Sequence, residues 1–485
     1  MKLFGLEIKR SSSVVTHKKG KPPAITLNRF LDSAAQGRLE ESWVKTPQTA
    51  DSIIYKDWKP TVARCVSEAN NTSHARKFLS LLKDNVTGPN GFTLAANVRN
   101  TSGSKDERAN KAIEDEYKEF SKPENFEVTG QFSRSQLERL GISTCATHGE
   151  FMVVRIIDRS INKWGIAFQI LDPLMVDSTY FSDLGNGVAI RAGVEMDAYR
   201  RPLAYHINQY DSWGHEFFES YNKRVRIPID RVTHAFMPEL INQPRGLPWM
   251  RTSLWQMRML KGYGDAAVTN ARVGASAMGL FTNEDADDDD DYFIDAAEPG
   301  TFADIGNRKL VNWDPQYPNG EFDPFTKSVL HWLSSGLLVS YHSLTGDLSD
   351  VNFSSIRQGE LDQREVWKGL QSWFSEALCR KLYEQWLEIA ILGSKIKVGN
   401  TPLRLDRLNR YKNVNFIGRR WDWVDPLKDI NAKAKEIELG ITTRARVIRE
   451  RSNEDPNEIF EEVKKEKQLF ESQKPKEAES PAEKH

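Results

Sequence analysis

The sequence contains fragments of catalytic motifs, and none of them is complete. HEFFE at 215–219 begins like a zinc-protease helix, but Glu219 stands where the second histidine ligand belongs. GASAM at 274–278 has Met278 where a nucleophile elbow requires glycine, and no GxxxxGK[ST] phosphate loop occurs. Aspartates are common enough that the carboxylate cluster of a metal-dependent nuclease stays an open alternative, although no spacing indicates one. The sequence therefore predicts no catalytic residue, no metal site and no cofactor.

An acidic run lies at 283–291 (NEDADDDDD). It ends in consecutive aspartates: Asp287, Asp288, Asp289, Asp290 and Asp291. The run lacks the alternating spacing and the glycine of a calcium-binding loop. Like charges repel one another and keep such a run in water, so we expect an exposed loop.

Basic residues recur along a segment with helical periodicity. Arg251, Arg258, Asp265 and Arg272 are spaced by seven, and Lys261 lies three residues beyond Arg258. Seven residues make nearly two helical turns, so these side chains share one slowly drifting face. Such a face could meet the phosphates of DNA, or it could pair with acids of another copy of the chain. The net charge of -1 favours the pairing, because a near-neutral assembly needs such pairs.

A second basic cluster consists of Lys223, Arg224 and Arg226, within a region of short β-type runs. It is either a solvated strand edge or a docking face for another protein. The residue types alone do not decide between these two interpretations.

Length, charge and cysteine usage limit the class of protein. A chain of 485 residues is too long for one compact core. Its net charge of -1 is unlike the strong positive charge of proteins that coat nucleic acid. Cysteines occur only at 65, 145 and 379, which argues against a disulfide framework or a zinc site and indicates synthesis in a reducing cytosol. No apolar run approaches the ~20 residues of a membrane span, so we expect no membrane partner.

The elements that position these residues follow from periodicity and turn signals. Residues 1–50 are polar and interrupted by KKGKPP, which indicates a weakly ordered arm. Residues 51–85 have a helical pattern, and 131–148 predict a helix that leads into a strand at 151–157. Short β-type runs separated by Gly, Asn, Asp and Pro indicate a β-rich module that reaches from 172 to 237.

A helix rich in small residues is predicted at 243–281, from about Pro248 to Gly279. It is either buried within one monomer or packed against copies of itself, and its composition fits both. A long helical pattern begins after Val351 and ends at Gly393. The segment 462–485 has almost no apolar residue, which predicts disorder.

The stretch VSYHSLTGDLSDVNFSSIRQG, residues 339–359, resembles a block that precedes a long helix in the lambda family of bacteriophage portal proteins. The matching positions are Gly336, Ser340, Tyr341, Leu344, Thr345, Asp347, Val351, Asn352, Ser354, Ser355 and Arg357. His342 and Phe353 depart from the family pattern. Further blocks at 193–207, 232–250 and 421–444 resemble family segments in the same order. The Asp, Asn and Ser residues of 350–354 are helix-capping types, so we interpret the stretch as a structural joint and not as an active site.

The resemblance implies an α+β portal protein fold, with a mixed α/β wing, an α-helical stem, a β-rich clip and a helical crown. Such chains assemble as a ring, typically a dodecamer, around a channel. The parts follow in chain order: wing at 51–130, stem-leading helix and strands at 131–171, clip at 172–237, stem helix at 243–281, channel loop and second wing part at 282–351, and long helix with crown at 352–461. The cluster at Lys223 is then the candidate docking face, and the acidic run belongs to the candidate channel loop.

The same resemblance implies a function without catalysis. Double-stranded DNA is packaged and ejected through the ring at one capsid vertex. The implied partners are the terminase large subunit, capsid and scaffold proteins, and later head-completion and tail proteins. The expected location is the virion, after synthesis in the bacterial host cytoplasm. A metal-dependent nuclease and a head–tail adaptor are the alternatives, although adaptors are usually shorter.

Overall fold

The computed structural model describes residues 46–100, 102–208, 224–276, 280–283, 308–311, 320, 322–349, 353–421, 426–451 and 456–473. The chain divides into two units, Met1–Gln48 and Thr49–His485, and all the elements below lie in the second. The predicted arm at 1–50 lies almost wholly outside the described residues.

A three-stranded antiparallel sheet with the order β3-β2-β9 lies at the centre of the fold. Its strands are β2 (Glu150–Ile157), β3 (Ile166–Leu171) and β9 (Val232–Phe236). Helix α5 (Arg134–His148) contacts β2, and a π-helical turn at Ser375–Cys379 contacts β9. Buried aromatic side chains fill this layer, with Phe120 packed against both Phe168 and Trp386.

Local signals explain where α5 begins and ends. Ser133 and Gln136 form a reciprocal capping box at its start. Gly149 ends it in the left-handed conformation, with a φ of 87°. A Cβ at Gly149 would come 2.4 Å from the carbonyl carbon of Leu247, so the chain passes too closely there for any other residue. The predicted helix at 131–148 and the strand that follows it are confirmed.

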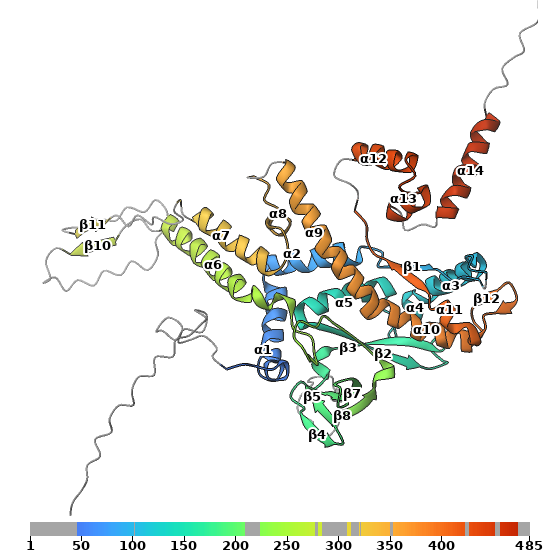
Figure 1. The fold of residues 1–485 in the computed structure, drawn as a ribbon. Helices are drawn as coiled ribbons and strands as arrows, with labels where there is room; N and C mark the ends of the chain where they lie inside the picture. The colour runs from blue at the N-terminus through green and yellow to red at the C-terminus, as the bar shows by residue number, and fades with distance from the viewer. Residues whose placement is uncertain are drawn as a thin grey trace, which may run out of the picture. The chain divides into compact units, whose positions relative to one another are not determined.

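Helices α1 (Ala50–Asn71) and α2 (Ser73–Leu82) lie beside α5 (Figure 1). The Thr49 side chain caps α1, and its buried residues Ile54, Trp58 and Val62 recur every four positions. This confirms the helical pattern predicted for 51–85, with one break at Thr72. Smaller elements complete this region: α3 (Glu107–Phe120), α4 (Pro123–Phe126), and β1 (Thr93–Ala96) paired with β14 (Val414–Ile417).

A second, five-stranded antiparallel sheet has its strands in sequence order. They are β4 (Ser182–Gly185), β5 (Val188–Arg191), β6 (Val194–Met196), β7 (Pro202–Asn208) and β8 (Arg224–Pro228). Val176 and Tyr205 of this region share a buried cluster with Met152 of the central sheet. The predicted β-rich module is therefore present, but its last run is not part of it: β9 pairs with β2. Strand pairing is non-local, and the pattern of a single run does not show its partner.

Helix α6 (Leu254–Ser276) and helix α7 (Phe322–Gly336) lie side by side (Figure 1). Between them in sequence, β10 (Leu280–Asn283) pairs with β11 (Arg308–Val311). The helix expected from Pro248 begins later, because Trp249–Thr252 close a 3-10 turn whose end is Ser253. Gly279, its expected end, lies outside the described residues. Helix α7 falls within the segment predicted to hold a channel loop, and its helical structure was not predicted.

The long helical pattern after Val351 is confirmed. Helix α9 (Phe353–Phe374) continues through the π-helical turn into α10 (Arg380–Leu392), and Gly393 follows. Figure 1 shows them as one nearly continuous helix. Short α8 (Tyr341–Thr345) precedes them, and β12 (Lys397–Val398), β13 (Thr401–Pro402) and α11 (Leu408–Tyr411) follow.

The chain continues into three further helices, α12 (Pro426–Glu438), α13 (Arg444–Arg451) and α14 (Pro456–Gln473). The disorder predicted from 462 is wrong as far as Gln473. It was inferred from the lack of apolar residues, but Glu, Lys and Gln are good helix formers and need no burial to favour a helix. Residues 474–485 lie outside the described residues.

Candidate functional site

The α6–α7 pair is held together at both ends. At the start of α6, the Thr252 hydroxyl donates to the Gly336 carbonyl over 2.7 Å, and the Ser253 hydroxyl donates to the Leu333 carbonyl over 3.2 Å. A Cβ at Gly336 would come 2.3 Å from Ser253 Oγ, so glycine is required at this crossing. Further along, the Tyr263 ring packs against Phe325 with centroids 5.2 Å apart.

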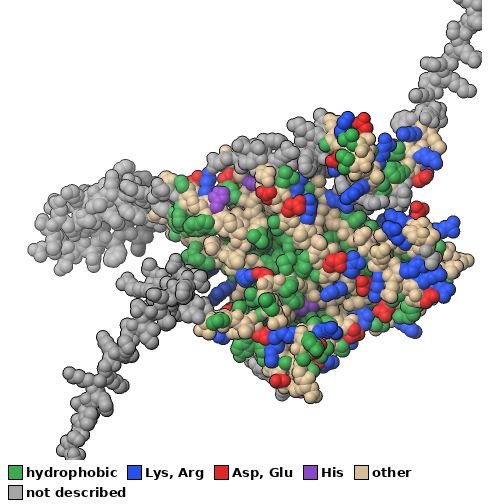
Figure 2. All heavy atoms as spheres, viewed as in Figure 1, with side chains coloured by type: hydrophobic (Ala, Val, Ile, Leu, Met, Phe, Trp, Pro, Cys, Tyr) green, Lys and Arg blue, Asp and Glu red, His purple; other side chains and the backbone are tan. Residues whose placement is uncertain are grey.

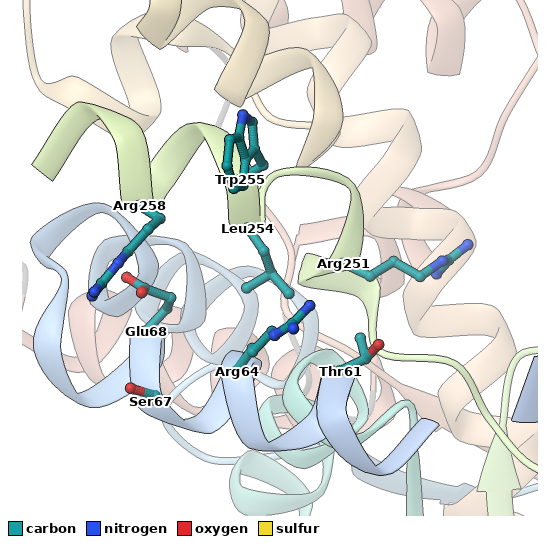
Figure 3. A pocket seen from close by; sticks show the side chains of 8 residues that line it. All are labelled: Thr61, Arg64, Ser67, Glu68, Arg251, Leu254, Trp255 and Arg258. Carbon is teal, nitrogen blue, oxygen red and sulfur yellow. The ribbon is translucent and has the colours of Figure 1, made fainter. Parts of the chain in front are cut away.

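A cavity of about 570 Å³ separates the start of α6 from α1 (Figure 3). Its lining residues are Thr61, Arg64, Ser67 and Glu68 from α1, and Arg251, Leu254, Trp255 and Arg258 from the other side. Glu68 is buried and accepts a hydrogen bond from the Thr72 hydroxyl. Within the part of the chain that the structure describes, Arg64 and Arg258 have no ion-pair partner. The wall of the cavity therefore carries more positive than negative charge.

The predicted row of basic residues does not form one phosphate-binding surface. Arg251 pairs with Glu239, with one N–O distance of 3.0 Å. The Lys261 ammonium donates to the carbonyl of Asn71 at the end of α1 over 3.3 Å. Arg258 lines the cavity, and Arg272 lies exposed further along α6. The charged side of α6 thus contacts the same chain in at least two places.

The second basic cluster is also bound within the chain. Arg224 donates to Asp177 Oδ2 over 2.6 Å and lies 4.1 Å above the Tyr180 ring. Arg226 makes two hydrogen bonds to Glu195, of 2.7 and 2.8 Å, and these lower the pKa of that carboxyl. Both arginines therefore fasten β8 to neighbouring segments. Lys223 lies outside the described residues, and so do Asp287, Asp288, Asp289, Asp290 and Asp291.

A buried ion-pair network, which we call the Glu150 network, was not predicted. Glu150 Oε1 accepts from Arg245 Nε over 2.7 Å, and Oε2 accepts from His234 Nε2 over 3.0 Å. The Tyr205 hydroxyl completes the row by donating to His234 Nδ1 over 3.0 Å. Arg245 also donates to the carbonyls of Val176, Ala192 and Pro173 over 2.8–3.2 Å, and it lies 4.4 Å above the Trp58 ring. The network joins both sheets to α1 and fixes the chain that enters α6.

The charge states of the network follow from its partners. Burial opposes the charged form of Glu150, but the Arg245 guanidinium outweighs burial and lowers the carboxyl pKa to about 2. Burial lowers the pKa of the His234 imidazole, so this ring is neutral, with its proton on Nε2 toward Glu150. The signal available in the sequence was the block 232–250, which contains both His234 and Arg245.

The stretch at 339–359 forms the joint between α7 and α9. Its Ser340 and Ser343 hydroxyls both contact Gln363 Oε1 of α9, at 2.7 and 3.0 Å. The Tyr341 hydroxyl donates to Asp347 over 2.9 Å and helps to lower the pKa of that carboxyl to about 2, after the hydrogen bonds from Ser349. These bonds fix the geometry of the joint. Asp350 and Asn352 lie outside the described residues.

Two further kinds of site were searched for in the described residues. They contain no group of three His, Cys, Asp or Glu side chains that could hold a metal ion. No described helix has the length and apolarity needed to cross a bilayer. The three cysteines are buried and free, and burial raises the pKa of the Cys65 thiol to about 12.

Comparison with known proteins assigns the family. The model of the lambda family of phage portal proteins matches residues 36–371. The chain is 32% identical to the probable portal protein of Halomonas phage phiHAP-1, over 92% of this chain and 87% of that protein. It is 21% identical to portal protein B of Escherichia phage lambda, over 86% of this chain and 85% of that protein. A chain from the neck of an empty gene transfer agent particle is similar over 84% of this chain and 94% of its own length, with 11% identity and a TM-score of 0.46.

The chain belongs to the lambda family of phage portal proteins. The resemblance seen in the sequence is thereby confirmed, and with it the α+β fold class and the function as a portal and head–tail connector. A portal protein is a structural component of the virion that works as a ring of identical subunits, and not an enzyme. The nuclease and the small adaptor are set aside by this assignment.

Proposed function

We propose that the chain forms a closed dodecameric ring in which α6 and α7 are the stem, and that double-stranded DNA passes through its centre in both directions. The observation that supports this most is the surface of these two helices. Trp255 and Trp332 are 71% and 64% exposed in the single chain, although tryptophan is normally well buried. A ring that packs such helices side by side would cover them. Figure 2 shows hydrophobic side chains at the surface over this pair of helices.

A near-neutral ring suits this function. Each phosphate that a protein neutralises strengthens binding through counterion release. A channel that bound phosphates tightly would slow the sliding of DNA. Lys and Arg side chains are mixed with Asp and Glu over the face shown in Figure 2, and the whole chain has a net charge of -1.

We propose the segment 277–321 as the clip, the docking face for the terminase large subunit and later for head-completion and tail proteins. Its described part is the β10–β11 ribbon, which follows α6 and precedes α7. A β-rich clip at the end of a helical stem requires this chain order. The earlier candidate at 172–237 has less support, because its sheet shares a buried cluster with the central sheet and its arginines are paired. The aspartates at 287–291 then belong to the clip segment.

Negative-stain imaging and native mass measurement of the purified full chain test the ring. We expect closed rings with a central hole, at high concentration or with scaffold protein present. Only monomers and dimers under both conditions would contradict the proposal.

The docking face is tested by packaging assays with two variants. Neutralising Asp287 to Asp291 should lower terminase-driven DNA packaging in rings that still form. The variant with Lys223, Arg224 and Arg226 changed to Glu should have reduced folding stability, because two of its side chains lose acidic partners. If instead this second variant folds and assembles normally but fails to package, the docking face lies on the β4–β8 sheet.

A further inference from the structure

Both stem helices have an apolar face that the described chain leaves uncovered. On α6 this face contains Trp255 and Met259, which are 71% and 47% exposed. On α7 it contains Phe325 and Trp332, which are 50% and 64% exposed. Each helix buries its opposite side, for example Met257 on α6. Large apolar side chains gathered on adjacent helices mark an interaction surface in a soluble protein.

A glycine on the same face of α6 indicates how close the partner comes. Gly262 lies seven residues after Trp255 and three after Met259, so it falls between them and Ala266 on this face. It is exposed, and a Cβ built on it meets no atom within 4 Å. Glycine in the middle of a helix is less favourable than alanine, and nothing in the described chain compensates at this position. The reason for this glycine therefore lies outside the chain.

We infer that the exposed face of α6, defined by Trp255, Met259, Gly262 and Ala266, packs against the exposed face of α7 in a second copy of the chain. This inference rests on the proposed ring. Rings close through heterologous contacts, in which one surface meets a different surface of the next subunit. An exposed face on α6 and another on α7 are two such surfaces.

The contacts within one chain set the register between copies. Rotation about the ring axis moves no residue along that axis. If the stem helices run along the axis, residues at one height in one subunit meet residues at that height in the next. Ser253 contacts Leu333, and Tyr263 packs against Phe325, which defines two such heights. Trp332 of the partner subunit therefore packs near Trp255 and Met259, and Phe325 of the partner subunit packs near Gly262.

DNA is a poorer occupant for this face. Phosphates require cations, and the cations nearest to the face, Arg251 and Lys261, contact Glu239 and Asn71 of their own chain. The face itself is apolar, and its exposed area would be removed from water by another helix. A second copy supplies that helix.

Two matched glycine variants test the close approach. Gly264 lies on the other side of α6, and a Cβ on it also meets no atom within 4 Å. Gly262→Ala and Gly264→Ala should both raise the thermal midpoint of the monomer slightly, because both add helix propensity. Only Gly262→Ala should raise the concentration needed for ring assembly, by about tenfold or more, which corresponds to 1.4 kcal/mol. Gly262→Leu should raise it further.

Cross-linking tests the register independently. All three native cysteines are buried, so a pair introduced by Met259→Cys and Trp332→Cys is the exposed pair. Mild oxidation should give a ladder of covalent multimers from assembled rings. If wild-type rings form but Gly262→Ala assembles like Gly264→Ala, or oxidation gives no multimers, the assigned face is wrong. If the wild-type chain forms no ring under any condition, the proposed function fails instead.

Discussion

Replacing Arg245 by methionine should destabilise the fold more than any comparable surface change. Methionine keeps the unbranched stem but removes the guanidinium. Glu150, which is fully buried, then keeps its charge without its main partner, and three backbone carbonyls lose a donor. Removing one partner of a buried ion pair costs about 3–5 kcal/mol. We expect a loss near the middle of this range, about 4 kcal/mol.

The loss can be converted into a thermal shift. Unfolding entropy is about 2.1 cal/mol/K per residue. A cooperative unit that spans Thr49–His485 therefore shifts by about 1 °C per kcal/mol. Arg245→Met should lower the unfolding midpoint of the monomer by about 4 °C, measured by tryptophan fluorescence during heating.

Arg226→Met is the matched control. Arg226 also makes two hydrogen bonds to a glutamate, but its side chain is 49% exposed. Exposed pairs contribute about 1 kcal/mol or less, so the control should shift the midpoint by about 1 °C or less. Adding Glu150→Gln to Arg245→Met should recover part of the loss, because it removes the buried charge. Equal shifts for Arg245→Met and Arg226→Met, or strictly additive losses in the double variant, would refute the reasoning.

Three further predictions concern the monomer. Its thermal midpoint should fall as the pH drops below about 6.5 and again below about 4.5, because His234 and Glu150 have lowered pKa values and the unfolded chain binds those protons first; a midpoint that stays level from pH 7 to 4 would contradict this. Gly336→Ala should destabilise by about 1–3 kcal/mol through its clash with Ser253 Oγ, whereas Gly369→Ala, with open space around it, should stabilise slightly in the same denaturation assay. Deleting residues 468–485 should leave the midpoint unchanged in calorimetry, since 461–469 are exposed, and a drop of several degrees would show that the tail packs on the fold.

Elements with local signals could be predicted from the sequence. Helix α5 has a capping box at Ser133 and a left-handed glycine at its end, and both signals lie within a few residues of the boundary they set. The long helix that ends before Gly393 has a regular apolar spacing. Boundaries set by tertiary contacts were missed. Helix α6 begins at Leu254 and not near Pro248, because Thr252 and Ser253 are committed to hydrogen bonds with α7.

The Glu150 network shows why a site could be missed while its family was recognised. Glu150 and Arg245 are 95 residues apart, and Arg245 reaches carbonyls 53 to 72 residues away. No periodicity relates positions at such distances. The block 232–250 could be recognised as a family segment, but its role as the connection between two sheets and α1 required coordinates.

The basic residues of α6 make the same point about periodicity. A spacing of seven correctly predicts that Arg251, Arg258 and Arg272 share one side of a helix, but it cannot say what lies opposite that side. In the structure, α1 and its neighbouring loop lie there, and Glu239 and Asn71 bind two of the cations of this row. The apolar face of α6 points elsewhere and is the one left uncovered. If that face is the contact between subunits, the cations position α6 within its own chain while the apolar face joins the ring, and assembly should depend on Gly262 far more than on Lys261.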